Sequence, residues 1–92
     1  MTNPLPDENN DERMDREAAI LVLNACYRAA REMGELGVAI EGFAPGTDGR
    51  EIKMQAGMVI AEIGRITDTI FQMHPDLEAY VESRIERFGR FS

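Results

Sequence analysis

Three glutamates on two segments of this 92-residue chain have the residue type and spacing of metal ligands. Glu32 and Glu35 are three residues apart, so on a helix their carboxylates share one face. Glu62 lies on a second segment with helical periodicity. Carboxylate oxygens suit Mg²⁺ or Mn²⁺, which keep several waters and bridge to the phosphates of a substrate. If Glu32, Glu35 and Glu62 converge, we expect them to bind such an ion.

The first two glutamates lie on a segment whose apolar residues recur in alternating steps of four and three. This spacing keeps side chains on one seam of a helix and is typical of helical bundles. The pattern predicts a helix from about Asp11 to Phe43, with the seam Val22, Cys26, Ala29, Met33, Leu36, Ile40 and Phe43.

Residues 44–49 contain one proline and two glycines and interrupt this pattern. We expect Asp48 to be the N-cap of a second helix, with Glu51 completing a capping box. The second helix is predicted from about Gly49 to Met73, and Pro75 ends it because the residue before a proline disfavours the helical conformation. A third, short helix is predicted to end near Gly89. The seam of the second helix is Ile52, Ala56, Val59, Ile63, Ile66, Ile70 and Met73.

Two seams of equal length joined by a short loop predict an all-α fold. It consists of a long antiparallel helical hairpin plus a short C-terminal helix. Pairing the arms outward from the loop sets residue 35 opposite about residue 58 and residue 32 opposite about residue 61. This register would bring Glu32, Glu35 and Glu62 together. Further apolar residues flank both seams, so we expect a homodimer that forms a helical bundle.

Composition narrows the classes of function. The net charge of −7 argues against nucleic-acid binding, which needs clustered Lys and Arg. No run of 18 apolar residues is present and the N-terminal region is acidic, so we expect a cytoplasmic protein without membrane contact. Cys26, the one cysteine, lies on the apolar stripe and is expected to be a buried thiol. We expect residues 1–10 to form a flexible acidic tail and residues 11–92 to form one helical domain.

Two runs of residues resemble the MazG-like all-α nucleoside triphosphate pyrophosphohydrolases. That family carries a Glu-Glu-x-x-Glu motif, usually within Glu-x-Gly-Glu-Leu, and a Glu-x-x-Asp motif on the next helix. The resemblance covers about residues 20–91, including a segment from Asp76 to Phe91 that is similar to the family's final helix. It implies a metal-dependent enzyme that releases pyrophosphate from a nucleoside triphosphate, with four carboxylates holding Mg²⁺ or Mn²⁺. The runs are Arg31-Glu32-Met33-Gly34-Glu35-Leu36 and Glu62-Ile63-Gly64-Arg65.

Arginine occupies two of the family's four acidic positions, at Arg31 and Arg65. A guanidinium removes a ligand and adds a positive charge where the metal would lie. Either the metal occupancy falls and the chain is a catalytically degenerate nucleotide-binding protein, or Arg31 and Arg65 hold a phosphate directly. Asp68, one turn after Arg65, is the candidate for a replacement metal ligand.

The same charged residues also fit an interpretation without catalysis. They can form ordinary one-turn ion pairs on a solvent-exposed helix face. The chain would then be a non-catalytic acidic helical module for protein–protein interaction, such as a regulatory or phage-type inhibitor, that binds itself or another protein. The expected pairs are Arg28 with Glu32, Arg31 with Glu35, and Arg65 with Asp68.

Overall fold

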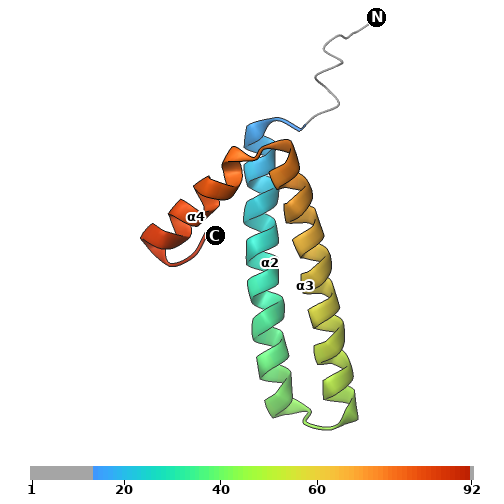
Figure 1. The fold of residues 1–92 in the computed structure, drawn as a ribbon. Coiled ribbons are helices and arrows are strands. Elements are labelled where there is room, and N and C mark those ends of the chain that lie inside the picture. The colour runs from blue at the N-terminus through green and yellow to red at the C-terminus, as the bar shows by residue number, and fades with distance from the viewer. Residues whose placement is uncertain (1–13, 92) are drawn as a thin grey trace, which may run out of the picture.

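The computed structural model describes residues 14–91. Within them lie the helices α2 (Arg16–Phe43), α3 (Thr47–Met73) and α4 (Asp76–Phe88). The helices α2 and α3 lie side by side and antiparallel, and α4 leaves the end of α3 at an angle (Figure 1). The predicted hairpin with a short C-terminal helix is therefore confirmed. The predicted tail at residues 1–10 lies outside the described residues. None of the three helices is long and apolar enough to cross a membrane.

The N-terminal end of α2 is fixed by a side-chain cap. The carboxylate of Asp15 accepts a hydrogen bond from the backbone N–H of Ala18 at 2.8 Å. This bond satisfies one of the N–H groups that the first helical turn leaves without a partner. The helix therefore begins at Arg16 and not near Asp11, as the sequence pattern suggested.

The second helix begins two residues earlier than predicted. Its N-cap is Gly46, in an extended conformation, and no side chain forms a capping hydrogen bond there. The predicted N-cap role of Asp48 is therefore wrong. Asp48 lies instead in the first turn of α3, where its negative charge favours the positive end of the helix dipole.

The core lies at the end of the hairpin away from the loop, where α4 meets α2 and α3. After α4, Gly89 has a φ of 85°, a left-handed conformation that glycine adopts easily. This turn brings Phe91 back against Tyr27, with ring centroids 5.2 Å apart. The buried residues that form one cluster here are Ala19, Leu23, Ile70, Leu77, Val81 and Phe91.

Two polar contacts tie the beginning of α2 to the beginning of α4. The Nε of Arg16 donates to the carboxylate of Asp76 at 3.0 Å. The ring nitrogen Nε2 of His74 lies 2.9 Å from the carbonyl oxygen of Met14 and donates to it. His74 thus joins two helix ends.

The two predicted seams are only half buried. Cys26, Ala56 and Ile70 are buried, but Leu36 is 38% exposed and Val59 is 46% exposed. Two helices in contact bury one side of each seam, and covering the remaining side needs a further element. The helix α4 does not supply that cover, because it packs on other residues of the hairpin.

Candidate functional site

The four predicted metal ligands lie on the surface. Glu32 and Glu35 are exposed on α2, and Glu62 and Asp68 are exposed on α3. Within residues 14–91, no group of three or more His, Cys, Asp or Glu side chains is placed to hold a metal ion. The metal-binding role of these acids stays a prediction.

The register of the hairpin lies within one helical turn of the one predicted from the loop. Ala30 of α2 and Ile60 of α3 line the same cleft, and Met33 lines a second hollow together with Gly57. Because the helices are antiparallel, Glu32 lies two residues nearer the loop than Ala30, and Glu62 lies two residues farther from the loop than Ile60. The two acids are therefore offset along the hairpin by about one helical turn, roughly 6 Å. The two motif segments are therefore neighbours, although their carboxylates face solvent.

The two arginines differ in their surroundings. The Nε of Arg65 lies 3.7 Å from Oε1 of Glu62, and both side chains are largely exposed. Such an exposed pair contributes little to stability, about 0–1 kcal/mol. The sequence predicts an ion pair between Arg65 and Asp68. In the structure Arg65 pairs instead with Glu62, the other acid one turn away. Arg31 is half-buried on α2. The phosphate-binding role of Arg31 and Arg65 stays a prediction.

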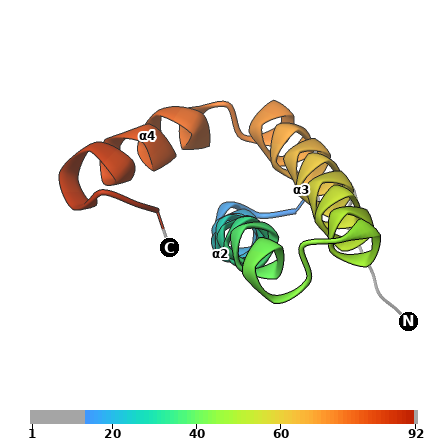
Figure 2. The same ribbon diagram turned by 90° about the horizontal axis from the view of Figure 1, so that it is seen from below.

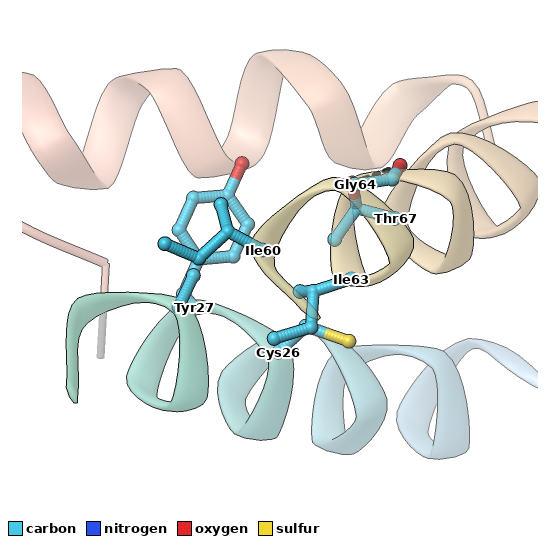
Figure 3. A pocket seen from close by; sticks show the side chains of 7 residues that line it. Cys26, Tyr27, Ile60, Ile63, Gly64 and Thr67 are labelled. Carbon is cyan, nitrogen blue, oxygen red and sulfur yellow. Dashed lines mark hydrogen bonds between the residues drawn. The ribbon is translucent and has the colours of Figure 1, made fainter. Parts of the chain in front are cut away.

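A small apolar cleft of about 150 Å³ lies between α2 and α3 beside the core cluster (Figure 3). Burial raises the pKa of the Cys26 thiol, so this group stays protonated near neutral pH. A protonated thiol is a poor nucleophile, which agrees with the structural role expected for Cys26. The apolar spacing of the sequence does not reveal this cleft, although small residues on both helices mark it. Its lining residues are Cys26, Tyr27, Ala30, Ile60, Ile63, Gly64 and Thr67.

An apolar surface runs along one side of both long helices. Three residues of each long helix recur every seven positions, so each set forms one stripe along its helix. All six are exposed, from 38% for Leu36 to 80% for Phe43 among the large side chains. We call this surface the open face. It comprises Ala29, Leu36 and Phe43 of α2 and Ile52, Val59 and Ile66 of α3.

The open face lies on the side of the hairpin opposite α4. Tyr27 and Phe71 pack against the core cluster to which α4 contributes. Ala29 is two residues from Tyr27, and Ile66 is five residues from Phe71. These separations correspond to roughly 200° and roughly 140° around a helix. Figure 2 shows α4 on one side of the hairpin, and no other helix of residues 14–91 covers the opposite side.

Comparison with known proteins finds no family model, no curated protein and no solved structure that matches this chain.

Proposed function

We propose that this chain is a helical protein-interaction module that binds another helical surface on its open face. The supporting observation is the row of apolar side chains that the fold leaves uncovered on two adjacent helices, among them Val59 at 46% and Ile66 at 42% exposure. Contiguous apolar surface of this kind marks protein interaction sites on proteins in water. Helix-in-groove binding uses such seven-residue stripes as anchors.

The energetics favour occupation of this face. Complete burial of one Val, Leu or Ile contributes about 1.5–3 kcal/mol, and these side chains are already partly covered, so each gains about 1 kcal/mol. Association costs several kcal/mol in lost freedom of motion. Five large apolar side chains on one face contribute about 5 kcal/mol toward that cost when a well-packed partner covers all of them.

The partner on the open face has two possible identities within this proposal. A second copy would form the homodimeric helical bundle expected from the sequence, with four long helices around one core. A helix of a different protein would form a three-helix core with α2 and α3. Both occupants use the same residues, so both are disrupted by the same substitutions.

The test introduces a charge into the open face and an equal charge elsewhere. Val59→Glu places a carboxylate at the centre of the α3 stripe, and Leu21→Glu replaces a 70% exposed leucine of α2 outside the open face. Sedimentation velocity measures each protein alone and with designed helical peptides, and circular dichroism verifies that the fold is kept. We expect a self-complex or a peptide complex that Val59→Glu abolishes and Leu21→Glu preserves. The proposal fails if no complex forms or if Val59→Glu leaves every complex intact.

A MazG-like pyrophosphohydrolase, active or catalytically degenerate, is the second candidate function. The observation that favours it is that Glu32 and Glu62 lie only about one helical turn apart along two helices in contact, which follows from the register of the hairpin. Glu32, Glu35, Glu62 and Asp68 would bind Mg²⁺ or Mn²⁺, and Arg65 would contact a phosphate of a nucleoside triphosphate. Its test is a pyrophosphate-release assay, described in the Discussion.

A further inference from the structure

The charges beside the open face indicate what kind of helix covers it. We propose that the occupant is an amphipathic helix of another protein with Lys or Arg on both flanks of its apolar stripe; this inference rests on the proposed interaction function. The two stripes of the open face, on α2 and α3, run side by side along the hairpin. One helix with an apolar residue at every third or fourth position can pack against both stripes at once.

The rim of the open face is acidic. A residue three positions after, or four positions before, an open-face residue is its neighbour on the outer edge of the same helix. By this rule Glu32 follows Ala29, and Glu62 follows Val59. All the rim residues are exposed, three are acidic and none is basic. They are Ala25, Glu32 and Ala39 of α2, and Asp48, Gln55, Glu62 and Thr69 of α3.

The ion pair between Arg65 and Glu62 does not neutralise this rim. Its atoms are 3.7 Å apart, and the side chains are 79% and 68% exposed, so water screens the pair strongly. The carboxylate of Glu62 therefore has room for a second cation. The chain as a whole carries a net charge of −7, which extends the negative potential beyond the rim.

A second copy of the chain complements this rim poorly. In a two-fold dimer the same patch meets itself, so the rim of one copy would lie against the rim of the other. Glu32, Asp48 and Glu62 of one copy would then meet carboxylates or uncharged groups, with no Lys or Arg from the rim residues to pair with them. A helix with basic flanks places positive charges against the acidic rim. Repulsion between like charges therefore disfavours a second copy of the chain relative to such a helix.

Two synthetic peptides test the proposal. Both carry the same apolar stripe of Leu and Ile over four heptads. One has Lys at every flanking position and the other has Glu, so like charges keep each peptide from pairing with itself. Fluorescence anisotropy measures the binding of each labelled peptide to the full chain at low and at physiological salt. We expect the Lys peptide to bind at least tenfold more tightly than the Glu peptide and to weaken as salt rises.

Variants of the chain separate charge from apolar contact. Val59→Glu is expected to abolish binding of the Lys peptide. The double variant Glu32→Gln/Glu62→Gln is expected to weaken binding severalfold at low salt and to leave binding of the Glu peptide unchanged or stronger. The matched double variant Glu17→Gln/Glu86→Gln removes two exposed acids away from the rim and is expected to have no selective effect.

The outcomes distinguish this inference from the proposed function. Equal binding of the two peptides, abolished by Val59→Glu, would overturn the basic partner and keep the interaction module. A stable homodimer that excludes both peptides and dissociates in Val59→Glu would do the same and identify a second copy as the occupant. A monomer that binds neither peptide would overturn both.

Discussion

A Cβ atom on Gly49 would lie 1.6 Å from the carbonyl oxygen of Ala44. The backbone that leaves α2 therefore crosses directly over the first turn of α3, at a distance that only a glycine permits. Gly49 is accordingly buried even though the loop around it is exposed. This contact fixes the approach of the two long helices where the hairpin closes.

Gly49→Ala should destabilise the fold. The added methyl group overlaps a backbone atom, which cannot rotate away as the end of a side chain can, so the loop or the start of α3 must shift. We expect the free energy of unfolding to fall by roughly 2–4 kcal/mol, in the range of strained positions. Urea denaturation followed by circular dichroism measures this loss. Gly57→Ala, on the same helix with no atom within 4 Å of its new Cβ, should instead raise stability by about 0.5–1 kcal/mol. Equal effects of the two variants would contradict the close approach.

Phe91→Ala should loosen α4 from the hairpin. The ring is 7% exposed and makes edge contacts with Tyr27 and Tyr80, at centroid distances of 5.2 and 6.1 Å. Removing it exposes the Tyr27 side of the core, and we expect a loss of about 2–3 kcal/mol, below the range of a central core position because the contacting Tyr27 and Tyr80 are themselves only half-buried. Hydrogen exchange of the α4 amides should accelerate as well. Phe88→Ala, which removes a 58% exposed ring, should cost less than about 1 kcal/mol. If Phe88→Ala costs as much as Phe91→Ala, the packing of Phe91 is not what holds α4.

The stability of the fold should fall as the pH rises through the range in which thiols titrate. Burial raises the pKa of Cys26 in the folded chain above its value in the unfolded chain. The folded state therefore binds the proton more tightly, so the contribution of Cys26 to stability is present at neutral pH and is lost as the pH rises past the ordinary thiol pKa. Denaturation midpoints between about pH 7 and pH 10 should decline more steeply for the native chain than for Cys26→Ala.

Tyr27 does not obscure this measurement. Burial, and then the charges of Glu78 and Glu82, raise the pKa of Tyr27, so its hydroxyl stays protonated over the same range. Parallel pH profiles for the native chain and Cys26→Ala would show that the thiol does not titrate differently in the two states.

Local signals made the helices and the hairpin predictable from the sequence. The proline and glycines of residues 44–49 and Pro75 interrupt the helical pattern where the structure has its connections. Gly89 ends α4 for the conformational reason that the sequence suggests, since its φ is positive. The cap at Asp48 was mispredicted because Gly46 and Thr47 can also begin a helix, and the backbone contact between Ala44 and Gly49 decides among them.

Which side of each seam is buried could not be read from the pattern. Cys26 and Ala29 both satisfy the seven-residue rhythm, yet Cys26 is buried and Ala29 is exposed. The difference arises from the rotation of α2 against α3, which also buries Gly37 beside the side chain of Lys53. The position of the acidic side chains depends on that same rotation, because it turns Glu32 and Glu62 toward the rim of the open face.

Pyrophosphate release decides between the two candidate functions. The purified chain is incubated with each common nucleoside triphosphate and Mg²⁺ or Mn²⁺. If Glu35 binds a catalytic metal, Glu35→Gln should lower the rate by at least about tenfold, because one carboxylate ligand is lost from a site that already lacks two acids at Arg31 and Arg65. Arg65→Asp would restore the acidic motif position and should raise the rate or the metal affinity, whereas Arg50→Asp makes the same charge change on α3 outside the motif and should raise neither. No pyrophosphate from the native chain or from Arg65→Asp would exclude an active hydrolase, and the absence of saturable nucleoside triphosphate binding to either protein would exclude the catalytically degenerate form as well.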